Sequence, residues 1–386
     1  MDFEKKTDWR GIRDKQEALL SRYACKSIDS KGRKIAEAPC KIRTKFERDG
    51  NRILYAPEFA RLRHKAQVFF NVKNDHVCTR MEHVLRVSAI ATTIAKTLNL
   101  NQDLTHAIAL GHDLGHAPFG HSGERVLNVC AQERDPDFPK FRHELNGLRV
   151  VDVLARKKSV DEATEMQGLN LTFEVRDGIV SHCGEAQEYI LYPDRKKGFA
   201  DLDNLRVLPK QPYTLEACIV KLVDKIAYVG RDVEDAIRLG IIDMNDISKE
   251  IKDVLGYTNG MIVNTLVEDV VENSFDADYI RLSDEKGQAL TALIAQNNTL
   301  IYRSDKIIRY EKGVRNVIEG VFDNFVNAAN DVERLAQSDL KCHKGFAQFI
   351  LAKGFGDASP LQNTVDFISG MTDNYAMGCY DEIYAL

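Results

Sequence analysis

Apolar residues recur at three- and four-residue intervals through most of this chain, which is the spacing of amphipathic α-helices. The pattern is clearest in residues 80–98, where the inward positions are Val84, Val87, Ala91, Ile94, Ala95 and Leu98. Residues 8–24, 56–70, 107–114, 123–132, 141–155 and 214–239 have the same period, and 241–386 is again mostly helical in pattern. The sequence therefore predicts an all-α fold.

Four stretches break the helical pattern and are predicted to lie outside helices. Residues 25–52 are basic and read as an irregular arm, 71–79 as a connector and 157–172 as a polar loop. Residues 189–212 combine three prolines with many charges, which predicts a surface loop and a candidate lid. Ser122 is the predicted N-cap of the helix that follows it.

Composition narrows the class of protein. The chain has 386 residues and a net charge of −5, which argues against a chain-wide nucleic-acid binder. Its eight cysteines form no CxxC pair, so we expect reduced thiols in a cytoplasmic protein. The N-terminus shows no signal-peptide pattern, and no apolar run reaches the roughly 18 residues that a membrane helix needs.

Candidate catalytic and metal-binding residues are most concentrated in residues 107–124, AIALGHDLGHAPFGHSGE. His112 and Asp113 are adjacent at the end of an apolar helix, which Gly115 stops. A neutral imidazole beside a carboxylate suits a divalent metal such as Mn, Fe, Ni or Zn.

Two further residues complete a candidate ligand set. His83 lies near the start of the amphipathic helix, on or beside its inward stripe. Asp224 stands among apolar residues of 214–239, where an ionised carboxylate is costly without a partner. The predicted metal ligands are therefore His83, His112, Asp113 and Asp224.

This ligand pattern resembles that of the HD-domain phosphohydrolases, and in particular the dGTP triphosphohydrolase-like branch, which includes the mammalian SAM-and-HD-domain dNTP hydrolase. HDLGHAPFGHSGE is close to the signature of that branch, and RTKFERDGNRI, FARLRHKAQVF and EACIVKLVDKIAYVGRDVEDAI resemble its other blocks. The resemblance covers roughly residues 8 to 240. It implies an N-terminal arm (1–55) at an interface, an HD helical core (56–240) and an α-helical C-terminal region (241–386) packed on that core.

The resemblance also implies substrate contacts. Gln67 matches a glutamine that lies against the deoxyribose, and Arg80 matches an arginine that contacts phosphate. Tyr228 and Asp232 match residues that contact the sugar. Arg231 stands where many members have histidine, which leaves the base or sugar preference open.

The implied reaction is attack of an activated water on the α-phosphorus of a dNTP, with a divalent metal (Mn, Fe, Ni, Mg or Co), to release deoxynucleoside and triphosphate. His121 is our predicted general acid, with Glu124 orienting it. His143 matches a second catalytic histidine that holds phosphate or assists the proton transfer. His116 is interpreted as structural, and His182 as a weaker candidate for substrate contact.

Two alternatives stay open on the sequence. One is an HD phosphohydrolase acting on monophosphates, cyclic dinucleotides or alarmones. The other is a non-catalytic protein that binds single-stranded nucleic acid or a regulator. Family analogy further suggests a homo-oligomer, hexameric or tetrameric, with a dNTP or single-stranded DNA effector near the basic arm. For Tyr302 and Tyr310 the sequence leaves two roles open, stacking on a nucleotide base or packing within the helices.

Overall fold

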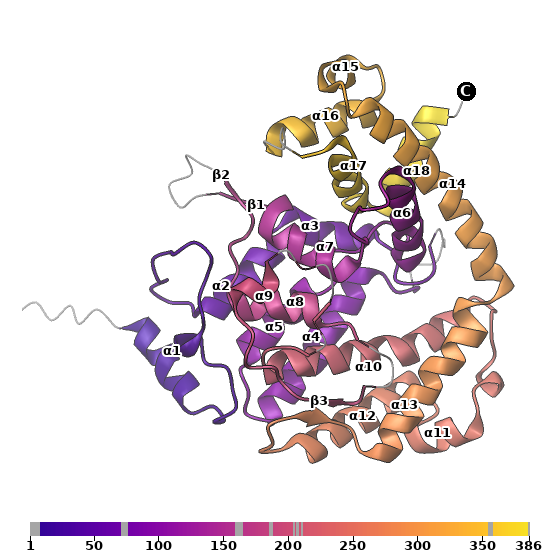
Figure 1. Cartoon of the computed structure of the whole chain (residues 1–386). Helices are drawn as coiled ribbons and strands as arrows, with labels where there is room; N and C mark the ends of the chain where they lie inside the picture. Colours follow the sequence, from indigo (N-terminus) through magenta and orange to yellow (C-terminus); the bar gives the residue numbers. More distant parts are fainter. Residues whose placement is uncertain are drawn as a thin grey trace, which may run out of the picture.

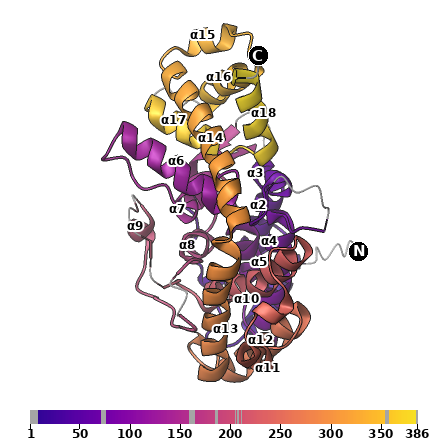
Figure 2. The same ribbon diagram turned by 90° about the vertical axis from the view of Figure 1, so that its right-hand side faces the viewer.

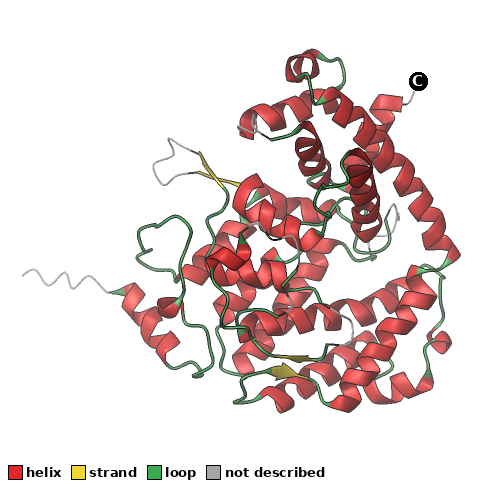
Figure 3. Cartoon of the chain, viewed as in Figure 1, coloured by secondary structure: helices red, strands yellow, loops and turns green. Residues whose placement is uncertain are grey.

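The prediction of an all-α fold is confirmed. The computed structural model describes residues 8–70, 76–158, 165–184, 188–203, 205, 208–209, 211–353 and 358–384. Within those ranges it has eighteen α-helices and two small two-stranded sheets (Figure 3). None of the described helices is both long and apolar enough to cross a membrane.

The N-terminal and central helices are α1 (Trp9–Ala18), α2 (Lys45–Leu54), α3 (Pro57–Arg61), α4 (Arg80–Thr97), α5 (Gln102–Gly111), α6 (Gly120–Arg134), α7 (His143–Arg149), α8 (Phe173–Ser181), α9 (Phe199–Leu202) and α10 (Leu215–Arg238). The later helices are α11 (Lys249–Leu255), α12 (Asn259–Ser274), α13 (Asp284–Asn297), α14 (Asp305–Ala328), α15 (Val332–Gln337), α16 (Lys341–Lys353), α17 (Pro360–Ser369) and α18 (Asp373–Tyr384).

Short elements join these helices. The 3₁₀ turns are η1 (Ser27–Asp29), η2 (Leu62–His64) and η4 (Met244–Asp246), and the π-helical turns are η3 (Val150–Leu154) and η5 (Asn298–Tyr302). Strand β1 (Arg156–Lys158) pairs antiparallel with β2 (Glu165–Gln167). Strand β3 (Ile190–Leu191) pairs antiparallel with β4 (Ile280–Arg281), so the predicted loop 189–212 is tied to the C-terminal part of the chain.

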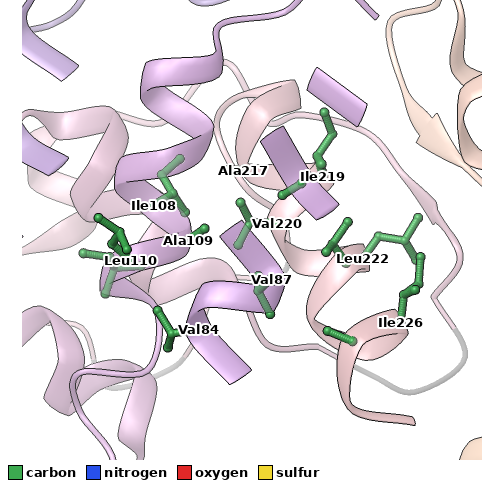
Figure 4. Close-up of a cluster of buried hydrophobic side chains, with 14 of the residues drawn as sticks. Val84, Val87, Ile108, Ala109, Leu110, Ala217, Ile219, Val220, Leu222 and Ile226 are labelled. Carbon is green, nitrogen blue, oxygen red and sulfur yellow. The ribbon is translucent and has the colours of Figure 1, made fainter. Parts of the chain in front are cut away.

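Helices α4, α5 and α10 form the centre of the larger hydrophobic core (Figure 4). Val84, Ile108 and Val220 come from these three helices in turn, and all three side chains are fully buried. Burying a side chain of this size contributes about 1.5–3 kcal/mol. A capping box between Thr79 and Glu82 fixes the first residue of α4. The three helices that carry the predicted metal ligands are thus held together by their apolar faces.

A second hydrophobic core lies between α6 and the C-terminal helices. Phe322 and Phe325 of α14 pack in it with Phe346 of α16 and with Leu127 of α6. Helix α14 runs from the lower part of the molecule to the upper group of α15–α18 (Figures 1 and 2). Residues 244–307, by contrast, contribute to the larger core. The three-part domain division stays a prediction.

The prediction of an irregular, solvated arm at 25–52 is wrong for its second half. Thr44 and Glu47 form a capping box that starts α2. Asp49 of this helix is fully buried and pairs with the guanidinium of Arg33. Some basic residues of this segment, such as Arg33, therefore bind buried carboxylates, whereas Lys31, Lys34, Lys41 and Arg43 are exposed.

Two other local predictions are also corrected. The helix predicted at 56–70 is only α3 and η2, because Ala66 forms a bridge with Thr79 instead of continuing the helix. Ser122 caps no helix: α6 starts at Gly120 after Phe119 in a left-handed conformation, and the Ser122 hydroxyl donates to Glu311. The connector residues 71–75 and loop residues 159–164 lie outside the described residues.

Candidate metal and catalytic site

Three helices bring the four predicted metal ligands together. His83 lies in the first turn of α4, His112 and Asp113 follow the last turn of α5, and Asp224 lies in the middle of α10. The His83 Nε2 atom is 2.8 Å from Asp224 Oδ1. The His112 Nε2 atom is 3.6 Å from Asp113 Oδ1 and 3.8 Å from Asp224 Oδ1. Two imidazole nitrogens and two carboxylates therefore face one point.

The chemistry of these donors fits a divalent cation. The Nδ1 atom of His112 donates to the carbonyl oxygen of Ala109 at 2.7 Å, which leaves Nε2 with its lone pair. That Nε2 is buried and has no hydrogen-bond partner within the described part of the chain. A buried nitrogen lone pair that has no hydrogen-bond donor and lies beside two carboxylates is satisfied by a bound cation. Imidazole and carboxylate together suit transition-metal cations.

Both aspartates are held in the ionised form that a metal requires. Burial raises the pKa of Asp224, but the hydrogen bond and the electrostatic attraction to His83, together with the interaction with His112, outweigh it and lower the pKa to about 2. Burial also raises the pKa of Asp113, but its interactions with His116, Arg80 and His112 together outweigh it and lower that pKa well below its ordinary value. His83, His112, Asp113 and Asp224 are therefore the residues that could hold the cation.

A second group of side chains is built around Glu124 of α6. Its Oε1 accepts the backbone N–H of His143 at 3.1 Å, and its Oε2 accepts from the Nδ1 atoms of His143 at 3.0 Å and His121 at 3.3 Å. The His143 ring is buried and stacks on His116 with ring centroids 3.8 Å apart. His121 is 63% exposed and lies at the mouth of the site.

The electrostatics divide these imidazoles into two kinds. Burial lowers the pKa of His143, but the hydrogen bond to Glu124 and the negative charges of Glu124, Glu144 and Asp113 together outweigh it, and the pKa is raised. Burial and the charges of Arg80 and His143 lower the pKa of His116 well below its ordinary value. The buried pair thus combines a histidine that favours its proton with one that stays neutral. His116 Nε2 lies 3.0 Å from Asp113 Oδ1, which links this group to the metal ligands.

These groups line a cavity of about 400 Å³. Arg80 reaches into it from α4, with Nη1 donating to Asp113 Oδ2 at 2.8 Å and Nη2 donating to the backbone oxygen of Gln67. At the other side Tyr228 and Asp232 line the cavity. Burial raises the pKa of Asp232 to about 7, although the Tyr302 hydroxyl donates a hydrogen bond to it.

A larger hollow of about 840 Å³ opens on the other side of His121 and His143. It shares Cys183 and Gly184 with the first cavity. Arg125, Lys140 and Arg142 supply positive charge at its wall. The Glu124 group therefore stands between two solvent-accessible spaces.

Comparison with known proteins agrees with this geometry. Residues 80–229 match the family described as HD domain, and residues 280–382 match the family described as Phosphohydrolase-associated domain. A protein of Caldanaerobacter subterraneus subsp. tengcongensis is 38% identical over 366 residues, which cover 95% of this chain and 92% of that protein. A protein of Desulfatibacillum aliphaticivorans is 36% identical over 373 residues, covering 95% of each. Both are named deoxyguanosinetriphosphate triphosphohydrolase-like protein.

The chain belongs to the HD-domain dGTP triphosphohydrolase-like family. All four candidate metal ligands lie inside the part of the chain that matches the HD domain.

Not every residue that the sequence singled out for substrate contact in this dGTP triphosphohydrolase-like chain lines the cavity. Arg231 does not line the cavity: it is buried and pairs with Glu234 at 3.2 Å and Asp235 at 3.1 Å. The Tyr310 ring packs edge-on against Phe70 at 5.3 Å, so its observed role is packing. Tyr302 does line the cavity, with its hydroxyl on Asp232.

Sequence reasoning missed several residues of the cavity. Lys225 follows Asp224 directly and lines the cavity, and its Nζ donates to the backbone oxygen of Glu188 at 3.1 Å. Cys183 follows His182, and its Sγ lies 3.4 Å from His143 Nε2. Adjacency to a candidate residue was the available signal for both. Asn298 comes from η5, in a region without a recognisable motif, so no local signal could have found it.

Proposed function

We propose that this chain hydrolyses deoxynucleoside triphosphates to deoxynucleoside and inorganic triphosphate, with dGTP as the first substrate to test. The observation that carries the proposal is the convergence of four metal-type donors, three buried and Asp224 partly buried, beside the Glu124–histidine group in one cavity. The names of the relatives that match over more than nine tenths of this chain support the same reaction.

We assign the proposed roles from the residues that line the cavity. His83, His112, Asp113 and Asp224 would hold a divalent cation, which would lower the pKa of a bound water and withdraw charge from a phosphoryl oxygen. Arg80 is buried and already aligned by Asp113, so its guanidinium can bind phosphate oxygens without losing side-chain entropy at that moment. Lys225 adds a second positive charge at the cavity wall.

The leaving 5′-oxygen of the sugar needs a proton, and the Glu124 group can deliver it. Glu124 fixes the Nδ1–H of both His121 and His143, which aims the Nε2 atom of each ring away from the carboxylate. His121 is exposed, so it can regain a proton from water after each turnover. We therefore propose His121 as general acid and the charged form of His143 as a phosphate contact.

The other end of the cavity fits a nucleoside. Tyr228 and Asp232 present a ring and a carboxyl group from α10, and Gln67 has a buried Oε1 atom without a hydrogen-bond partner among the described residues. Asp232, with its pKa near 7, can donate or accept toward a sugar hydroxyl. We propose that these three residues bind the deoxyribose, and that Tyr302 orders Asp232.

The assembly and its control are also proposals. By family analogy we propose a homo-oligomer, hexameric or tetrameric, with residues 1–55 near a subunit contact. A dNTP or single-stranded DNA would act there as effector. Measuring the mass of the full chain by light scattering with and without dNTP tests this point.

The product identity decides the function. The purified full chain is incubated with each dNTP and Mn²⁺, and the phosphate products are separated by anion exchange. We expect intact triphosphate and deoxynucleoside, and no products from the His112→Ala, Asp113→Ala double variant. Pyrophosphate as product would overturn the proposal. Turnover of monophosphates, cyclic dinucleotides or alarmones alone would assign another HD phosphohydrolase activity, and binding of single-stranded DNA without turnover would assign a regulatory role.

A further inference from the structure

Three soft donor atoms meet at the border between the two hollows, apart from the four candidate metal ligands. His143 begins α7, His182 directly follows α8, and Cys183 is the next residue. Each offers one ligand atom, and these atoms all lie within 4.8 Å of one another. The Sγ atom of Cys183 lies 3.4 Å from the Nε2 atom of His143.

Both imidazoles have the hydrogen bonding of metal-binding histidines. His143 Nδ1 lies 3.0 Å from Glu124 Oε2, and His182 Nδ1 lies 2.6 Å from the carbonyl oxygen of Ile179. Each acceptor fixes the proton on Nδ1, so the neutral ring keeps the Nε2 lone pair for a cation. A carboxylate or backbone carbonyl behind the ring is the usual outer support of a metal-bound histidine. His112, in the first site, has the same bond to the carbonyl three residues before it.

Burial and access also favour a bound ion. His143 is 4% exposed and His182 is 1% exposed, so their positions are fixed by packing. Cys183 is only partly buried, and it lines both hollows, so an ion can reach the thiol from solvent. Cys183 lies outside α8, where the backbone can shift to close the donor set. Zinc needs Zn–S of about 2.3 Å and Zn–N of about 2.0 Å, so the closure is a movement of roughly 1 Å.

We propose that His143, His182 and Cys183 form a second metal site, selective for a thiophilic divalent cation such as Zn²⁺, whose occupation inhibits the enzyme. A thiolate with two imidazoles is a donor set for zinc, whereas Mn²⁺ and Mg²⁺ prefer oxygen ligands. On binding, one S–metal and two N–metal bonds form, the thiol proton and the Nε2 proton of any charged His143 pass to solvent, and no electron is transferred. Occupation removes the His143 Nε2 atom from contact with phosphate. The inhibition rests on the proposed function; the binding does not.

Cobalt reports the sulfur ligand directly. The full chain is stripped with a chelator, dialysed and titrated with Co²⁺, and the near-ultraviolet thiolate-to-cobalt charge-transfer band is followed. The first site has only nitrogen and oxygen donors and contributes no such band. We expect the band in the wild-type chain and its loss in Cys183→Ser.

Cys40→Ser is the matched control. Burial raises the pKa of Cys40, but backbone hydrogen bonds from Ile42 and Arg43 outweigh it and lower the pKa to about 7, which makes this thiol a strong competitor for adventitious metal. We expect Cys40→Ser to keep the band.

Inhibition is measured on dNTP hydrolysis at saturating Mn²⁺ with added Zn²⁺. Each variant is normalised to its own zinc-free rate, and we expect Cys183→Ser to need at least about tenfold more zinc for half inhibition. A band that persists in Cys183→Ser, or zinc inhibition equal to wild type in that variant, would overturn the proposal. If no dNTP is hydrolysed, the cobalt band still tests the site, so the two proposals fail separately.

Discussion

Asp373, the first residue of α18, joins the C-terminal helices to the histidine-rich loop, and replacing it is the most direct test of what holds that loop in place. Its Oδ1 accepts the backbone N–H of Phe119 at 2.8 Å, and its Oδ2 accepts the backbone N–H of Ala66 at 2.9 Å. The side chain is buried. One carboxylate thus binds two chain segments that lie 307 and 254 residues away in sequence.

The surroundings of Asp373 reinforce this connection. Lys65 is buried beside it and donates to the carbonyl oxygens of His116 and Ser369. Phe119 has a φ of 62°, a left-handed conformation that costs a non-glycine residue of order 1 kcal/mol or more. The bond to Asp373 offsets that strain, and it sets the direction in which the chain enters α6 toward His121.

The expected loss of stability follows from these bonds. Asp373→Ala leaves the buried N–H of Phe119 and the partly buried N–H of Ala66 without an acceptor, at a cost of roughly 1–3 kcal/mol for the first and less for the second. Burial raises the pKa of Asp373, which shows that the carboxylate itself is desolvated at a cost. Removing it recovers part of the loss, so we expect a destabilisation of about 2–4 kcal/mol. Asp373→Asn keeps one acceptor oxygen and should lose about half as much.

Urea unfolding measures the stability, and steady-state kinetics measures the effect on the site. A displaced loop misplaces His116 and His121, so we expect kcat to fall by about tenfold to a hundredfold in Asp373→Ala, with a smaller change in KM. Asp381→Ala, an exposed aspartate of the same helix, is the control and should change neither quantity. An Asp373→Ala chain that keeps wild-type stability, or loses stability while keeping its kcat, would refute the reasoning.

Three further predictions concern single groups. His112→Ala combined with Asp113→Ala should abolish bound metal and turnover while helical content by circular dichroism stays the same; retained turnover would remove the metal from the reaction. Glu124→Gln should keep bound metal, measured by atomic absorption, but lower kcat by about a hundredfold, since it no longer favours the proton on either histidine; unchanged kcat would exclude this role. Burial raises the pKa of Glu216 from 4.5 to about 7, so the folded chain holds a proton there that the unfolded chain releases between these values. Stability should therefore fall by up to about 3 kcal/mol as pH rises through that window, and Glu216→Gln should flatten the dependence in urea unfolding at about pH 5 and about pH 7.5; an unchanged slope would contradict it.

Regular apolar spacing was enough to predict the long helices of the core. The prediction of 214–239 agrees with α10, and that of 80–98 agrees with α4, because in both the inward stripe is continuous and a threonine caps the first turn. The convergence of His83, His112, Asp113 and Asp224 was also predictable, because the motif fixes their order and each lies on or next to a strongly patterned helix. Predictions failed where tertiary contacts decide the local structure.

Residues 25–52 illustrate that failure. Their charge made them look solvated, yet Arg33 and Arg52 bind buried or mostly buried carboxylates of Asp49 and Glu37. Only the partner shows whether an arginine is exposed, and the partner is not adjacent in sequence. The N-cap prediction at α6 failed for the same reason. Asp373, more than two hundred residues away, accepts a hydrogen bond from the Phe119 N–H, and the Ser122 hydroxyl bonds Glu311 instead.

The C-terminal region explains why the cavity could not be completed from the HD motif alone. Residues 280–382 match a separate family, but they supply Asn298 and Tyr302 to the cavity wall and Asp373 to the loop that carries His116 and His121. Tyr302 is the hydrogen-bond donor of Asp232, whose buried carboxyl group would otherwise be costly. An HD core without these residues would leave one cavity wall open and the Phe119 N–H unsatisfied. The two regions therefore build one site, and a prediction that treats residues 241–386 as a layer packed on the core misses their contribution to it.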